Sequence, residues 1–108
     1  MASNLEFIEF VCEQVRQLGA VRYKKMFGEY MVYINEKPLL LVCDNIVYVK
    51  KLPELASVMQ NAETGIPYGG AKEHYILDVE NAEITSAAIT ILDQNTKVPV
   101  KKPKKENK

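Results

Sequence analysis

The chain has 108 residues, of which 47% are hydrophobic and 26% are charged, and its basic and acidic side chains are equal in number. This composition is typical of one small domain with a single hydrophobic core, and it excludes collagen-like and disulfide-scaffold proteins. The longest apolar run, residues 38–43, is far shorter than the roughly 20 residues of a membrane span, and residues 1–9 lack the basic start of a secretory signal. We therefore expect a cytoplasmic protein without a membrane-spanning segment.

The neutral total charge hides a segregation along the chain. Six lysines and one glutamate follow Gln94, so residues 95–108 carry a net charge of +5 and residues 1–94 carry −5. Because this last segment has low hydrophobicity and two prolines, we expect residues 1–94 to form the domain and residues 95–108 to form a disordered basic tail. The tail is either a solvated segment or a non-specific electrostatic arm for nucleic acid. The candidate arm residues are Lys101, Lys102, Lys104 and Lys105.

The spacing of apolar residues between positions 3 and 18 predicts an amphipathic helix. Ser3 and Glu6 have the spacing of a capping box, and Gly19 supplies a residue that can adopt the left-handed conformation common at helix ends. Phe10 is the one large apolar residue off the core-facing stripe, so we expect it to be exposed. The stripe consists of Leu5, Phe7, Ile8, Val11, Cys12, Val15 and Leu18.

Between residues 21 and 50, apolar side chains recur at every second position, and this alternation predicts four antiparallel strands. Their predicted ranges are 21–27, 29–34, 39–43 and 46–50, with a tight turn or bulge at Gly28 and turns at 35–38 and 44–45. Alternation places Tyr30, Val32 and Ile34 on one face of the sheet. Met31 and Tyr33 lie on the other face. Both faces are apolar, so either the sheet is covered on both sides or one face is adhesive.

The second half of the chain predicts a short helix over residues 53–62, closed by Gly65, then a loop at 66–70 and a strand at 75–79. Asn81 is a good N-cap for a final helix. The inward face of that helix is predicted to carry Ile84, Ala87, Ala88, Ile91 and Leu92. The resulting order, α-β-β-β-β-α-β-α with about five strands, predicts the α+β class and not a parallel nucleotide-binding sheet.

The sequence contains few candidates for catalytic, phosphate-binding or metal-binding residues. The glycine pair 69–70 before Lys72 lacks the spacing of a phosphate-binding loop, and His74 has no recognisable nucleophile or partner carboxylate. Cys12 and Cys43 both lie in apolar patterns, and with one histidine in the chain they do not complete a zinc site. The sequence therefore predicts no catalytic residue, no cofactor and no metal.

One basic and aromatic cluster lies inside the expected fold, between residues 22 and 27. It consists of Arg22, Tyr23, Lys24, Lys25, Met26 and Phe27. The cluster is either a solvated strand face or a binding patch. The acidic body and the absence of repeated stacking aromatics argue against sequence-specific nucleic-acid binding.

Two blocks of the sequence, residues 22–33 and 40–50, resemble the N-terminal domain of the TfoX/Sxy family of bacterial competence regulators. The best-matching motifs are Met26-Phe27-Gly28 and Val47-Tyr48-Val49-Lys50. The resemblance extends over residues 4–92. Glu29 departs from the pattern, since the family usually has a second glycine there.

The resemblance implies a two-layer α+β domain with a curved antiparallel sheet. It also implies a non-enzymatic role in transcription regulation through contact with the transcription machinery or an activator of the cyclic-AMP receptor type. The full-length regulators carry a second domain that is not recognised in this chain, and a homodimer is left open. Candidate partner-binding residues are Arg22, Lys24, Lys25, Met26, Phe27, Gly28, Met31 and Tyr33.

A rival hypothesis is a small-molecule-binding domain or enzyme. Its pocket would lie between the sheet and the 53–62 helix, roofed by the loop at 66–70. Its polar groups would be Tyr68, Lys72 and His74.

Direct nucleic-acid binding is predicted to be weak, non-specific and carried by the tail. The tail lysines can neutralise about five or six phosphates, so the log of the affinity for duplex DNA should fall with log salt at a slope of roughly −4 to −5. Fluorescence anisotropy at increasing salt measures this slope. A chain ending at Thr96 should lose the binding. Tight binding of one duplex sequence by that shortened chain at near-physiological salt would contradict the prediction.

Overall fold

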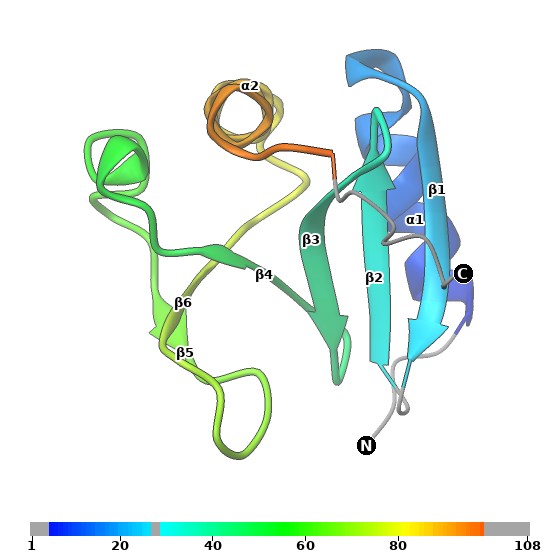
Figure 1. The fold of residues 1–108 in the computed structure, drawn as a ribbon, viewed down its shortest axis with the longest axis horizontal. Helices are drawn as coiled ribbons and strands as arrows, with labels where there is room; N and C mark the ends of the chain where they lie inside the picture. Colours follow the sequence, from blue (N-terminus) through cyan, green and yellow to red (C-terminus); the bar gives the residue numbers. More distant parts are fainter. Residues whose placement is uncertain (1–4, 27–28, 99–108) are drawn as a thin grey trace, which may run out of the picture.

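The computed structural model describes residues 5–26 and 29–98, and it has the predicted α+β class (Figure 1). The helices are α1 (Leu5–Val15) and α2 (Ala82–Asn95), with short 3-10 helices η1 (Arg16–Leu18) and η2 (Pro53–Leu55). The strands are β1 (Val21–Met26), β2 (Glu29–Ile34), β3 (Lys37–Cys43), β4 (Ile46–Lys50), β5 (Thr64–Gly65) and β6 (His74–Ile76). They form one antiparallel sheet in the order β1-β2-β3-β4-β6-β5. The sheet thus has six strands, one more than the sequence predicted.

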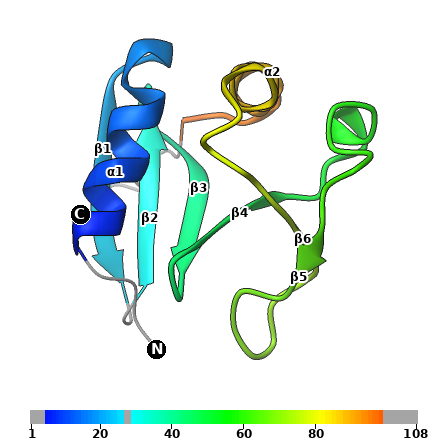
Figure 2. The same cartoon turned by 180° about the vertical axis from the view of Figure 1, so that it is seen from behind.

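The helices pack against one face of a strongly curved sheet. Figures 1 and 2, seen from opposite sides, show α1 lying against β1 and β2, while α2 lies beside β3 where the sheet bends toward β4. Residues from both helices and from the central strands are buried in one core. Its members include Ile8, Val11, Val15, Val32, Ile34, Leu40, Val42, Val49, Ala88, Ile89 and Leu92. Within residues 5–26 and 29–98, no helix combines the length and apolar character needed to cross a bilayer.

The end of the first helical region differs from the prediction. Gly19 has φ 161° and is extended, not left-handed. A glycine fits here because a Cβ would lie 2.7 Å from Asn35 Oδ1, the atom that accepts the Ala20 N–H. Phe10 is half-buried, not exposed, and its ring centroid lies 6.2 Å from that of Phe7. The proposed cap residue Ser3 lies outside the described residues.

Two tight hairpins set the register of the central strands. Asn35 and Glu36 connect β2 to β3, and Asp44 and Asn45 connect β3 to β4. All four residues have positive φ, between 54° and 67°, as type I′ turns require. The predicted turn at 35–38 is shorter than expected, because two residues suffice for a turn whose twist matches the strands.

The segment after β4 contains the largest corrections to the sequence prediction. The predicted helix at 53–62 is only the 3-10 turn Pro53–Leu55 followed by further turns. Gly65 does not close a helix; it lies in β5, and a Cβ there would be 3.3 Å from the Tyr48 ring. The two-residue strand β5 was missed because so short an element has no detectable period.

The start of α2 follows the sequence prediction more closely. Asn81 Oδ1 accepts the Ile84 N–H at 3.1 Å, which confirms the N-cap. The preceding strand β6 ends at Ile76, earlier than predicted, and the Asp78 carbonyl accepts the Asn81 N–H and the Thr85 hydroxyl. Thr85 is therefore buried, and the inward face of α2 is rotated from the predicted one. The buried residues are Thr85, Ala88, Ile89 and Leu92, while Ile84, Ala87 and Ile91 are half-buried.

An ion pair joins the start of β3 to the last turns of α2. Lys37 Nζ lies 3.2 Å from Asp93 Oδ1 and donates to the Asp93 carbonyl oxygen at 2.7 Å. Asp93 Oδ1 is inaccessible to solvent, so the lysine is the charge that compensates it. A cation near a helix C-terminus also interacts favourably with the helix dipole.

We predict that Lys37→Met lowers the free energy of unfolding by about 1 to 3 kcal/mol, because it removes the charge that compensates a shielded carboxylate oxygen and the donor to a helix-end carbonyl. Urea denaturation followed by circular dichroism measures the change. Lys51→Met is the matched control, since the Lys51–Glu73 pair is exposed and screened by solvent and should contribute much less to stability. Equal effects of the two substitutions would contradict the prediction.

Candidate functional site

The strand register divides the side chains of β1, β2 and β3 between two faces. Val32 and Ile34 lie on the inner face under the helices and are fully buried. Arg22 pairs with Tyr33, and Lys24 pairs with Met31, on the opposite face. We call this opposite surface the outer face; it consists of Arg22, Lys24, Met26, Met31, Tyr33 and Leu41.

The outer face brings together five of the eight residues predicted to bind a partner. Lys25 does not share it, since alternation places this side chain on the inner-face side opposite Tyr30. Phe27 and Gly28 lie outside the described residues. The four tail lysines proposed to contact nucleic acid, 101, 102, 104 and 105, also lie outside them.

The two outer-face cations of β1 differ in their surroundings. Arg22 donates from Nε and Nη2 to the Glu36 carboxylate at 3.0 to 3.2 Å, and its guanidinium carbon lies 4.1 Å from the Tyr33 ring centroid. The hydrogen bond to Glu36 raises the pKa of Arg22 above its usual value. Lys24 is exposed and makes no ion pair with any residue in the described ranges. Among the described residues, Lys24 is therefore the outer-face cation of β1 that no carboxylate neutralises.

An apolar groove lies beside these cations. It has a volume of about 400 Å³, and Met26, Met31 and Leu41 line it together with Glu29 and Tyr68. Tyr68 comes from the loop between β5 and β6 and is 50% exposed. Methionine side chains adapt to differently shaped partners, so such a groove suits an apolar side chain from another molecule.

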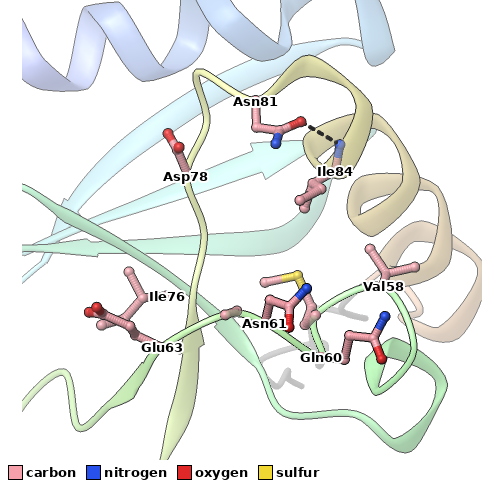
Figure 3. Close-up of a pocket in the computed structure, with 10 residues that line it drawn as sticks. Val58, Gln60, Asn61, Glu63, Ile76, Asp78, Asn81 and Ile84 are labelled. Carbon is pink, nitrogen blue, oxygen red and sulfur yellow. Dashed lines mark hydrogen bonds between the residues drawn. The ribbon is translucent and has the colours of Figure 1, made fainter.

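A second, larger cavity lies at the start of α2. Its volume is about 560 Å³, and Figure 3 shows Asn81 and Ile84 on one side and the turn segment after η2 on the other. Its lining contains two carboxylates and three amides but no basic side chain. The lining residues are Val58, Met59, Gln60, Asn61, Ala62, Glu63, Ile76, Asp78, Asn81 and Ile84.

The rival pocket hypothesis named other residues, and the structure does not bring them together here. Tyr68 lines the outer-face groove instead. His74 Nδ1 lies 2.7 Å from the Lys72 carbonyl oxygen, and its ring meets that of Tyr48 edge-on. Lys72 is exposed and lines neither space. The larger cavity was missed because its walls come from segments whose turns have no sequence period.

Comparison with known proteins identifies the family. The sequence pattern of the TfoX N-terminal domain matches residues 13–88. The chain belongs to the TfoX N-terminal domain family. It is also 33% identical over 114 residues to a Spirochaeta aurantia protein described as "Uncharacterized 12.7 kDa protein in trpE 5'region", covering 97% of this chain and 91% of that protein. The resemblance of the two sequence blocks is thereby confirmed.

The matched part of the TfoX N-terminal domain contains all six strands and therefore the whole outer face. Glu29, which departs from the usual glycine, lies at the end of this face, and Cys43 hydrogen-bonds to it. Burial raises the pKa of the Cys43 thiol to about 12, with a further contribution from the Glu29 charge. Burial thus favours the protonated form of the thiol, which is less nucleophilic than the thiolate. Among the described residues, no three His, Cys, Asp or Glu side chains are grouped so that they could hold a metal ion.

We predict that the Cys43 thiol makes the TfoX N-terminal domain lose stability at alkaline pH. Its pKa rises from 9.0 to about 12 on folding, so folding favours the protonated thiol and the advantage is lost as the pH rises from 9 toward 12. We expect this thiol to account for about 3 kcal/mol of the loss over that range, since each unit of pKa shift corresponds to about 1.4 kcal/mol. Urea denaturation at several pH values measures it.

Cys43→Ala is the control for this prediction, because the variant lacks the titrating thiol but keeps Tyr48, whose pKa burial also raises. The variant should lose less stability than the original chain between the same pH values. Parallel pH profiles of the two proteins would contradict the prediction.

Proposed function

We propose that this TfoX N-terminal domain is a non-enzymatic protein-interaction module that acts in transcription regulation by binding a protein partner through its outer face. The observation that carries the proposal is the composition of this face. Half-buried Met31, Tyr33 and Leu41 lie beside exposed Lys24, on the side of the sheet opposite α1. An apolar centre with a charged rim is the common arrangement of a protein interface.

The surroundings of the reactive side chains support a binding role over catalysis. The Cys43 thiol is held protonated by burial. His74 Nδ1 contacts a backbone carbonyl, and its ring packs against Tyr48. Neither group lines the larger cavity or the outer-face groove. A catalytic pair needs a nucleophile and a base within hydrogen-bond reach, and these contacts do not provide one.

The partner class rests on the family. By the resemblance, partners are the transcription machinery or an activator of the cyclic-AMP receptor type. Fully burying an exposed methionine or leucine contributes about 1.5 to 3 kcal/mol, and because Met31 and Leu41 are already half-buried, covering each contributes part of that amount. Several such side chains together can still carry much of an interface. Lys24 would then mainly guide association with an acidic surface.

The larger cavity favours one alternative, a small-molecule-binding domain. Its volume of about 560 Å³ suits a small organic ligand. A thermal-shift screen with nucleotides and metabolites tests this alternative, because a ligand at 100 times its dissociation constant stabilises the fold by about 2.7 kcal/mol. A binder whose effect disappears in Ile84→Asp would favour it, while unchanged melting curves across the library would remove its support.

We predict that the immobilised domain retains purified RNA polymerase or a receptor-type activator at micromolar concentration. Lys24→Glu and Met31→Asp should each weaken this binding at least about tenfold, equivalent to about 1.4 kcal/mol. Lys72→Glu is the matched control, because this exposed lysine lies outside the outer face and the charge change is the same. Thermal unfolding confirms that each variant is folded. Retention of no candidate by the folded domain would contradict the proposal.

A further inference from the structure

Strand β1 lies at one end of the sheet. Among the described residues its pairing partner is β2, on one side only. The other side of a terminal strand carries backbone N–H and C=O groups without a strand partner, which can pair with another extended chain. This edge borders the outer face, since Arg22 and Lys24 belong to both.

A single backbone hydrogen bond shows which β1 residues direct their polar groups to the open side. The Asn35 N–H donates to the Ala20 carbonyl at 2.8 Å, so the Ala20–Asn35 pair is hydrogen-bonded. Hydrogen-bonded and non-hydrogen-bonded pairs alternate along an antiparallel ladder, and the β1–β2 register is uninterrupted. Arg22 and Lys24 therefore bond to β2. The N–H and C=O groups of Val21, Tyr23 and Lys25 point away from it.

The open side of β1 is accessible at residues whose backbone groups point away from β2. Tyr23 is 40% exposed and Lys25 is exposed. A hollow of about 520 Å³ lies between this edge and α1. Its lining mixes apolar and charged side chains: Glu9, Cys12, Glu13, Arg16, Val21, Arg22 and Tyr23. An added strand beside β1 would direct alternate side chains toward α1, and this hollow has space for them. Side chains that point outward would lie next to Arg22 and Lys24.

The charges select the kind of chain that can pair here. A second copy of β1 would place Arg22, Lys24 and Lys25 beside the same cations, and like charges on adjacent strands are destabilising. The basic residues 97–108 are disfavoured for the same reason. An acidic side chain beside Lys24 is attracted instead.

We infer that the β1 edge binds an extended segment of a protein partner as an added strand, with acidic residues on the outward positions beside Lys24. This inference rests on the proposed function and names the partner chemistry of the same surface. Backbone pairing with Tyr23 and Lys25 supplies affinity, and the alternating side chains supply selectivity.

Amide hydrogen exchange of the isotope-labelled full chain tests the inference with a defined probe, an acetylated seven-residue peptide of alternating Glu and Val. The peptide should slow exchange of the Tyr23 and Lys25 amides at least tenfold, while the Arg22 and Lys24 amides, already bonded to β2, change little. A peptide with Lys in place of Glu should produce no protection. Equal protection of all four amides, or none at millimolar peptide, would overturn the inference.

A matched pair of variants tests the backbone contact with the full protein partner. Lys25→Ala and Lys25→Pro both lose the charge, but the proline variant alone loses the outward N–H, and edge strands accept proline at such positions. Lys25→Pro should bind the retained partner at least tenfold more weakly than Lys25→Ala. Equal binding would overturn strand addition while leaving the outer-face interaction in place.

N-methylated peptides keep the test independent of how the proline variant folds. Methylation of the alternate peptide amides that face β1 should abolish protection, and methylation of the other set should not. Equal effects of the two sets would overturn the inference. A different result tests the proposed function: it is wrong if the folded domain retains no candidate partner in the binding experiment above.

Discussion

Burial of one face of the central strands beneath two helices is the constraint on which the rest of the structure depends. Val32, Leu40 and Val42 have no exposed surface, and the helices contribute Val11 and Leu92 to the same core. Because side chains alternate along a strand, this burial forces the neighbouring residues to the other face. The outer face is therefore a direct consequence of how the core is packed.

The tight hairpins decide which residues meet on that outer face. A shift of one residue in the pairing of β2 would move every side chain to the opposite face. The link between Ala20 and Asn35 holds the far end of the β1–β2 pair through two hydrogen bonds, one to the backbone and one to the amide side chain. The compact glycine at position 19 leaves room for that amide. Loop chemistry at one end thus positions Lys24 beside Met31 several residues away.

The lysines of β1 have a protective role and a selective role for the same physical reason. Positive charge on a terminal strand disfavours pairing with another copy of the same strand, which keeps an exposed edge from aggregating. The same charge attracts an acidic chain. Burial, meanwhile, keeps the Cys43 thiol protonated.

Local patterns in the sequence determined the elements whose hydrogen bonds or periods are short-range: β2, β4, the Asn81 cap and the two motif blocks of the TfoX N-terminal domain. Tertiary contacts alone decided the rest. β5 exists because it pairs with β6, Thr85 is buried because its hydroxyl reaches the Asp78 carbonyl, and Lys37 matters because Asp93 approaches it from 56 residues away. The physical reason is the range of the interaction: periodicity and capping act within a few residues, whereas these contacts join segments that only the folded chain brings together.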